Sequence, residues 1–127
     1  RMMNRIAERI AGKKYQVLIT GESVGQVASQ TLENINSIQA AVKKLILRPL
    51  IGLDKQEIIE RARAIETLPV STLPYEDCCS RFVPKHPATK TRIQQLEEVE
   101  KDIPLEDLIN DAVKNTKLFK FNFKNNE

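Results

Sequence analysis

Two adjacent cysteines, Cys78 and Cys79, are the residues of this chain with the clearest capacity for covalent chemistry. They stand in a proline-rich stretch, after an acidic pair and shortly before Arg81 and Lys85. These cations could hold a nearby thiol as the thiolate, which would act as a nucleophile or a sulfur carrier, whereas the acidic pair disfavours the thiolate. The alternative is a pair of buried, inert cysteines. Because the two thiols stand together in a loop, we favour chemistry.

A glycine-containing stretch from Thr20 to Gln30, TGESVGQVASQ, could bind a nucleotide. Glycine lets the backbone approach a ligand closely, and a helix that follows such a stretch offers unpaired N–H groups to adenine or phosphate. The stretch is neither a P-loop nor a GxGxxG motif, and short strand-to-helix turns commonly contain glycine. A ligand-binding loop and an ordinary turn therefore both stay open.

Lys55 stands at the first helical position after Asp54, which its spacing to Glu57 predicts to be the N-cap of a capping box. A positive side chain at this end of a helix opposes the helix dipole. The same lysine becomes useful when an anion binds, because the cation and the helix N-terminus then act together. The alternative is an exposed lysine whose flexible side chain avoids the dipole.

One clearly basic window contains Arg81, Lys85, Lys90 and Arg92, with no acidic residue between them. This window could contact the phosphates of a nucleic acid, and Phe82 could stack on a base. A solvated loop spaced by prolines is the alternative. The chain has a single histidine, so we expect neither a histidine-based metal cluster nor a Ser-His-Asp arrangement.

Composition limits the class of protein. The chain has 127 residues, about one domain, with 41% hydrophobic residues, 29% charged residues and a net charge of +3. No apolar run approaches the roughly 20 residues that span a bilayer, and no secretory signal opens the chain. With two cysteines a secreted disulfide framework is excluded, so we expect a cytoplasmic protein. Because the first residue is arginine, we also expect a piece of a longer protein.

The spacing of apolar residues predicts alternating helices and strands. We expect a helix over Arg1–Lys14, a second helix with an apolar stripe from Val24 to Val42, and a third that begins after its cap at position 54 and buries Ile58, Ile59, Ala62 and Ile65. Between them, Tyr15–Thr20 and Leu45–Leu47 read as short strands, the first of them buried on both faces. This order of elements predicts a parallel α/β sheet.

The loops after the two predicted strands should meet at one edge of the sheet. Ligands of parallel α/β sheets bind beyond the carboxyl ends of the strands. Thr20–Gly25 and Arg48–Lys55 would therefore share a functional edge. Farther along the chain we expect a loop over Pro69–Pro87 and a terminal strand over Phe119–Phe123. C-terminal helices are predicted over Thr91–Lys101 and Pro104–Asn115, with Pro104 in the first turn.

Four strings in this chain resemble those of one enzyme family. They are RMMNRIAERIA, TGESVGQVASQTLENI, LILRPLIGLDKQEIIERAR and LPYEDCCSRFVPKHPATK, and together they cover most of Arg1–Lys90. They occur in the same order in the tRNA 4-thiouridine sulfurtransferases (ThiI), where they lie in the C-terminal half of the catalytic domain. Strings of this length are specific.

The resemblance implies a fold, a reaction and partners. The fold would be adenine nucleotide α-hydrolase-like (PP-loop), a partial, doubly wound parallel sheet in a Rossmann-like three-layer arrangement. The family uses ATP with Mg²⁺ to adenylate a tRNA uridine, whose oxygen is then replaced by persulfide sulfur to give 4-thiouridine. A cysteine desulfurase supplies the persulfide, and many bacteria also use the enzyme to make the thiazole of thiamine.

The resemblance also implies roles for individual residues. Lys55 would contact phosphate, and Cys78 or Cys79 would be the catalytic-domain cysteine that resolves the persulfide. The nucleotide side of the site would comprise Thr20, Gly21, Glu22, Gly25, Gln26 and Gln30. The basic window at Arg81, Lys85, Lys90 and Arg92 would contact RNA.

The family's PP-loop motif (SGGxDS), its THUMP region and its rhodanese domain are not found in this chain. We therefore expect residues 1–127 to be the C-terminal portion of a PP-loop sulfurtransferase domain that is inactive alone. One alternative is a non-catalytic α/β binding or self-assembly module, whose unpaired sheet edge would form a homodimer. A related ATP-dependent tRNA thiolase or ligase is the other.

Overall fold

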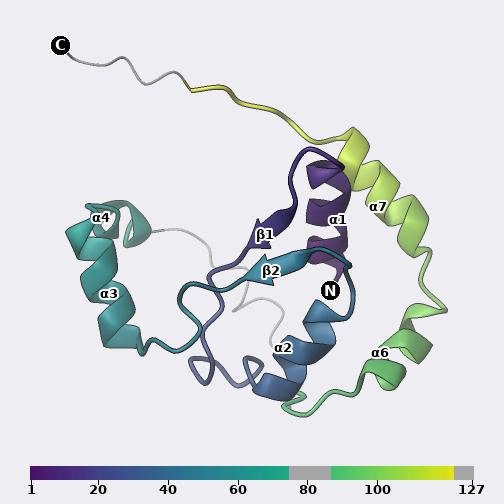
Figure 1. The fold of residues 1–127 in the computed structure, drawn as a ribbon, viewed down its shortest axis with the longest axis horizontal. Helices are drawn as coiled ribbons and strands as arrows, with labels where there is room; N and C mark the ends of the chain where they lie inside the picture. Colours follow the sequence, from purple (N-terminus) through teal and green to yellow (C-terminus); the bar gives the residue numbers. More distant parts are fainter. Residues whose placement is uncertain (75–86, 122–127) are drawn as a thin grey trace.

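Two short parallel strands lie side by side in the middle of the fold (Figure 1). The computed structural model describes residues 1–74 and 87–121. Within these residues the elements in chain order are α1 (Met2–Ala11), β1 (Val17–Ile19), α2 (Leu32–Gln39), β2 (Leu45–Leu47), α3 (Lys55–Ala64), α4 (Leu68–Ser71), α6 (Ile93–Glu100) and α7 (Leu105–Lys114). The fold is α/β with a small parallel sheet, as the order of apolar patterns predicts.

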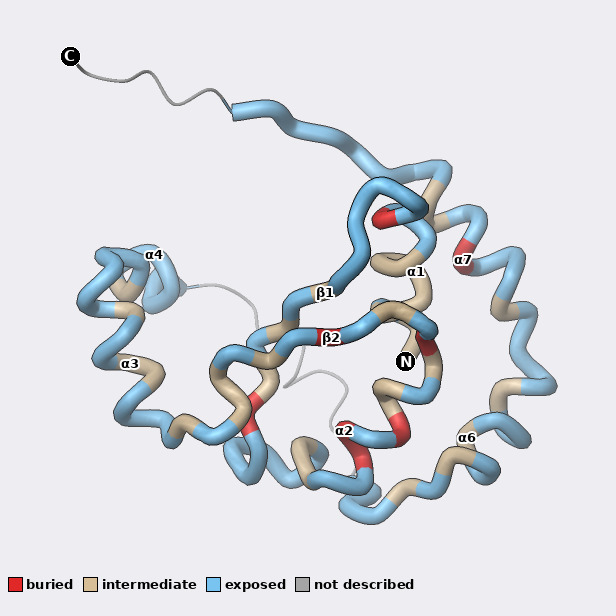
Figure 2. Tube along the Cα trace, viewed as in Figure 1, coloured by how far each residue is buried: buried red, intermediate tan, exposed pale blue. Residues whose placement is uncertain are grey.

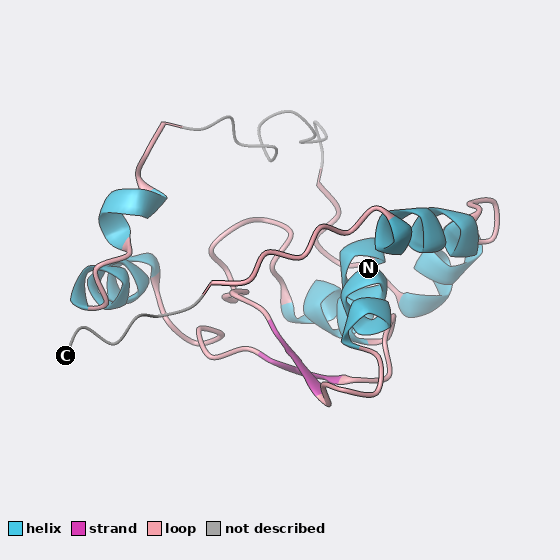
Figure 3. Cartoon of the chain, turned by 90° about the horizontal axis from the view of Figure 1, so that it is seen from above, coloured by secondary structure: helices cyan, strands magenta, loops and turns pink. Residues whose placement is uncertain are grey.

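The two strands have one covered face and one open face. Their register places Val17 opposite Leu45 and Ile19 opposite Leu47. These four side chains, which we call the open sheet face, are all exposed, Ile19 to 69%. Ile46 on the other face is 4% exposed. The prediction that the first strand is buried on both faces is wrong for the described residues, because the helices near the N-terminus lie on one side of the strands (Figure 3).

The buried core is small and joins four elements. Figure 2 shows its positions in red, at the end of α1, along α2, in β2 and in α7. The buried hydrophobic side chains among the described residues are Ala11, Ile35, Val42, Ile46 and Ile109, and the buried polar ones are Ser23, Asn34 and Ser37. Neither α3 nor α4 contains a buried residue.

α1 ends at Ala11, the last residue of its apolar pattern, and Gly12 stops it, within the Arg1–Lys14 range that the sequence predicts. Gly12 has φ +52°, a conformation that favours glycine, and its N–H donates to the Glu8 carbonyl at 3.1 Å. The helix packs against α7, where Arg9 donates to Glu106 at 2.8 Å and to Asn110 at 2.9 Å. These hydrogen bonds hold α1 to α7.

The second helix begins at Leu32, eight positions after the predicted start, so the prediction of a helix from Val24 is wrong. Gly25 has φ +80°, its N–H donates to the Gln30 carbonyl at 2.9 Å, and the Gln30 N–H donates to Val27 at 2.9 Å. These bonds close a loop over residues 25–30, so the backbone there is not helical. Thr31 then caps the helix, because its hydroxyl accepts from the Asn34 N–H at 3.2 Å.

The predicted start of α3 is confirmed. Asp54 is its N-cap, and reciprocal bonds with Glu57 at 2.8 and 2.9 Å complete the capping box. The predicted burial of its apolar stripe is wrong, because α3 packs mainly on the one-turn helix α4, apart from the rest in Figure 1. Ile58, Ile59 and Ala62 are half-buried, and Ile65 is exposed.

The helices predicted near the C-terminus are confirmed as α6 and α7. Pro104 takes the N-cap position of α7 rather than a place inside the first turn. Residues 117–121 form no strand, so the strand predicted over Phe119–Phe123 is wrong as far as residue 121. The part of the predicted loop over Pro69–Pro87 that the structure describes contains α4.

Candidate nucleotide site

The loops that follow β1 and β2 lie against each other at the carboxyl edge of the sheet. The Thr20 N–H donates to the Leu47 carbonyl and the Val24 N–H donates to the Ile51 carbonyl, both at 3.0 Å. The Ser23 hydroxyl, on a residue only 2% exposed, donates to the Leu53 carbonyl at 2.6 Å. The prediction that the two loops share one edge is therefore confirmed.

A half-buried ion pair joins the same two loops. One carboxylate oxygen of Glu22 accepts from the Thr20 hydroxyl at 2.7 Å and from Arg48 Nε at 2.8 Å. The Arg48 and Glu22 side chains are 12% and 18% exposed. Arg48 Nη1 also donates to Gln39 in α2 at 3.0 Å. Thr20 and Glu22 thus hold the loops together.

A cavity of about 380 Å³ lies where the loop after β1 meets the first turn of α3. Its lining residues are Gly21, Ser23, Gln26, Val27, Gln30, Lys55, Ile58 and Ile59. The volume falls in the range of small-molecule sites. Apolar walls suit the flat face of a base, and Lys55 supplies a positive charge. The arrangement can hold a nucleotide.

The structure brings together four of the sequence-predicted nucleotide-site residues at this cavity: Gly21, Gln26, Gln30 and Lys55. Thr20, Glu22 and Gly25 do not line the cavity. Thr20 and Glu22 take part in the hydrogen bonds that join the two loops, and Gly25 forms the turn of the first loop. The cavity also uses Val27, Ile58 and Ile59, which the sequence pattern assigns to buried stripes. Their helical spacing is the signal for burial, so nothing in the sequence marks them as cavity walls.

The cysteine doublet and half of the basic window lie outside the described residues, namely Cys78, Cys79, Arg81, Phe82 and Lys85. Lys90 and Arg92 are described, and both are exposed. They lie beside the N-terminal end of α2, because the Thr31 hydroxyl donates to the Thr89 carbonyl at 2.6 Å. Neither lines the cavity.

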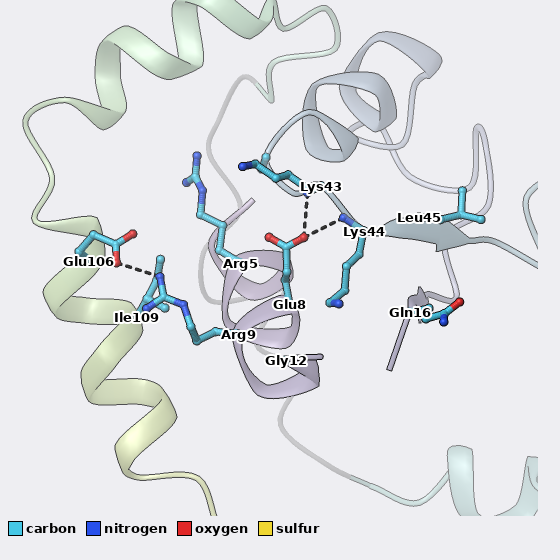
Figure 4. A pocket seen from close by; sticks show the side chains of 11 residues that line it. Arg5, Glu8, Arg9, Gly12, Gln16, Lys43, Lys44, Leu45, Glu106 and Ile109 are labelled. Carbon is cyan, nitrogen blue, oxygen red and sulfur yellow. Dashed lines mark hydrogen bonds and ion pairs between the residues drawn. The ribbon is translucent and has the colours of Figure 1, made fainter. Parts of the chain in front are cut away.

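A second, larger hollow of about 680 Å³ lies at the opposite, amino edge of the strands (Figure 4). Its charged groups mostly have partners. The carboxylate of Glu8 accepts from the backbone N–H groups of Lys43 and Lys44 at 2.8 Å, and Arg9 is paired with Glu106 (Figure 4). We therefore assign these residues to packing between α1 and its neighbours.

The ion pairs of α1 with α6 are the strongest electrostatic feature of the described residues. Glu100 accepts from Arg1 at 2.7 and 2.8 Å and from Arg5 at 3.0 and 2.7 Å. Hydrogen bonds from Arg1, and then from Arg5, lower the pKa of Glu100 to about 2. This contact lies away from the cavity and stabilises the fold.

Residues 1–74 and 87–121 contain no group of three or more His, Cys, Asp or Glu side chains that could hold a metal ion. Across the same residues, every helix is too short or too polar to cross a membrane.

Comparison of the sequence with known protein families shows which family this chain belongs to. The sequence model described as "Thiamine biosynthesis protein (ThiI)" matches residues 1–105. The chain belongs to the ThiI family.

Curated relatives and a solved structure agree with the ThiI family. A probable tRNA sulfurtransferase of Acetivibrio thermocellus is 50% identical over 119 residues, which cover 93% of this chain and 30% of the relative. One of Thermoanaerobacter pseudethanolicus is 53% identical over 112 residues, covering 87% and 30%. A solved 4-thiouridine synthetase–RNA complex with bound ATP has a TM-score of 0.81 and 44% identity over 91% of this chain and 31% of that one. The chain spans about 30% of the length of these relatives.

Proposed function

We propose that this chain is the C-terminal portion of the PP-loop, adenine nucleotide α-hydrolase-like catalytic domain of an ATP-dependent tRNA sulfurtransferase. The whole protein would adenylate a tRNA uridine and replace its oxygen with persulfide sulfur to give 4-thiouridine. The cavity that joins Lys55 to the loop after β1 carries this proposal. It lies at the edge of the sheet where parallel α/β folds bind ligands.

The residues of the site would have different roles. Gly21, Gln26 and Gln30 would face the nucleotide, since they line the cavity, and Lys55 would neutralise phosphate charge as pyrophosphate leaves. Thr20 and Glu22 would hold the loop in place. Mg²⁺ would arrive bound to the ATP phosphates.

The sulfur-transfer half of the reaction would use the cysteine doublet. Cys78 or Cys79 would resolve the persulfide that a cysteine desulfurase supplies. The basic residues Arg81, Lys85, Lys90 and Arg92 would contact tRNA phosphates. The enzyme would act in the cytoplasm, and it would also deliver sulfur for the thiazole of thiamine.

Calorimetric titration of ATP tests the proposal. The full-length protein that carries this chain should bind ATP, and Lys55→Ala should weaken binding about tenfold because a charge-assisted contact to phosphate is lost. Lys13→Ala, an exposed lysine after α1, is the matched control and should bind as the wild type does. The proposal fails if titration of the full-length wild type with ATP shows no binding.

A second candidate function is self-association through the open sheet face. The exposure of its four apolar side chains favours this candidate, because contiguous apolar surface marks an interaction site. The homodimer would then be the functional unit. Size-exclusion chromatography of this chain with mass detection distinguishes the two: a clean monomer removes this candidate and leaves the sulfurtransferase proposal intact.

A further inference from the structure

Asn34, near the start of α2, is a polar residue only 6% exposed. Burying an amide side chain is costly unless its hydrogen bonds are made. The Asn34 amide nitrogen donates to the Ser29 carbonyl at 3.0 Å and to the Ala88 carbonyl at 2.7 Å. Its oxygen accepts from the Thr91 N–H at 2.9 Å and from the Thr91 hydroxyl at 2.7 Å. Two donors and two lone pairs are thus all in use.

The partners of Asn34 come from two different parts of the chain. Ser29 belongs to the loop after β1 and stands directly before Gln30, a lining residue of the cavity. Ala88 and Thr91 belong to a segment that runs past the N-terminal end of α2 toward α6 (Figure 1). One side chain therefore joins the cavity loop to a segment 54 to 57 positions away in sequence.

Thr31, the N-cap of α2, and Ser37 within α2 add hydrogen bonds to the same distant segment. The Thr31 hydroxyl donates to the Thr89 carbonyl at 2.6 Å, and the Ser37 hydroxyl, on a residue 1% exposed, donates to the Thr91 carbonyl at 3.1 Å. These contacts are directional, so they set the register of the segment against α2, which apolar contacts would not do. Lys90 stands between two of the bonded residues, so its backbone is held at the start of α2.

We propose that Asn34 is a positioning residue of the sulfurtransferase reaction. It fixes the cavity loop relative to residues 88–91, which follow the cysteine doublet in sequence and carry the basic Lys90. The inference rests on the proposed function, since it concerns how the cavity loop is held for the nucleotide. A merely structural role would lower the amount of folded enzyme and reduce every activity by the same factor.

Steady-state kinetics of the full-length protein, with ATP, tRNA and a persulfide donor, distinguish these roles. Asn34→Asp keeps the oxygen that accepts from Thr91 but sets a second carboxylate oxygen against the carbonyls of Ser29 and Ala88. We expect kcat for 4-thiouridine formation to fall at least about tenfold per folded enzyme, with a higher KM for ATP, because two buried donors are lost. Asn36→Asp makes the same change at an exposed position of α2 and should behave as the wild type.

Thr91→Val weakens only the contact between Asn34 and residues 88–91. It provides the test if Asn34→Asp does not fold. It removes the hydroxyl that donates to Asn34 and leaves the bond to Ser29 intact. We expect kcat for 4-thiouridine formation to fall about threefold with KM for ATP unchanged. The inference is overturned if both variants match Asn36→Asp, or if KM for ATP stays constant in Asn34→Asp and activity follows only the folded fraction. A wild type that makes no 4-thiouridine would instead overturn the proposed function.

Discussion

At the scale of single residues, an ion pair contributes to the stability of the fold when its side chains are partly removed from water. Glu100 accepts four hydrogen bonds from two arginines and is 15% exposed. The exposed pair Glu98–Lys101 on the same helix is more than 65% exposed on both sides. Buried or shielded pairs contribute to stability, whereas exposed pairs contribute little. The two glutamates therefore offer a direct comparison.

Glu100→Gln should lower the free energy of unfolding at neutral pH by about 2 kcal/mol, the scale of charged hydrogen bonds. The pKa of Glu100 is about 2 in the folded protein, against an ordinary value of 4.5. A lowered folded pKa stabilises the protein above the unfolded pKa, and this stability is lost as pH falls from about 4.5 toward about 2. Urea denaturation at several pH values measures it. Glu98→Gln should change little, and an equal loss in both variants would contradict the prediction.

At the scale of elements, the loop after β1 shows how one turn shapes a site. Gly25 holds φ +80°, and this conformation lets the chain turn back so that Gln26, Val27 and Gln30 line the cavity. The capping box at Asp54 positions the start of α3. The helix begins at Lys55, which lines the cavity. Turn and cap together define the candidate nucleotide site.

Gly25→Ala should weaken ATP binding severalfold and lower the free energy of unfolding by about 1 kcal/mol, because a positive φ is strained for any residue with a Cβ. Gly52→Ala is the matched control: Gly52 lies in the neighbouring loop, has no positive φ, and its added Cβ would meet no atom within 4 Å. Calorimetry and urea denaturation measure the two effects. If the two variants are indistinguishable, the strain at Gly25 does not support the cavity.

At the scale of the whole molecule, the described residues bury few apolar side chains and leave the open sheet face uncovered. Parallel sheets usually have both faces covered. The chain spans about 30% of its relatives' length, so most of a full-length relative lies outside the matched region. We expect part of that remaining length to cover the open sheet face.

Ile19→Glu should therefore change the free energy of unfolding by different amounts in this chain and in the full-length protein. In this 127-residue chain Ile19 is 69% exposed, so the change should alter the free energy of unfolding by less than about 0.5 kcal/mol. In the full-length protein the carboxylate would be buried without a partner, and we expect a loss of about 3 kcal/mol or more. Thermal or urea denaturation of both forms measures it. A small effect in both lengths would show that the face stays open.

Much of the local structure follows from the sequence because its causes are local. The capping box at Asp54 and the two C-terminal helices are predicted correctly, since a cap or a helical stripe needs only neighbouring residues. The helix expected from Val24 fails, because its apolar residues keep helical spacing while Gly25 and the bonds to Gln30 turn the backbone out of a helix. Spacing alone cannot distinguish these cases.

By itself, the sequence determined the family, the α/β order of the elements and the edge of the sheet at which the loops after the two strands meet. Only the tertiary structure decided that Lys55 meets Gly21 and Gln30 at one cavity, that Glu22 serves a loop-to-loop ion pair, and that Asn34 joins two distant segments. The reason is physical. Helix caps and strand patterns depend on residues a few positions apart, whereas a cavity or a buried hydrogen bond depends on how the whole chain packs.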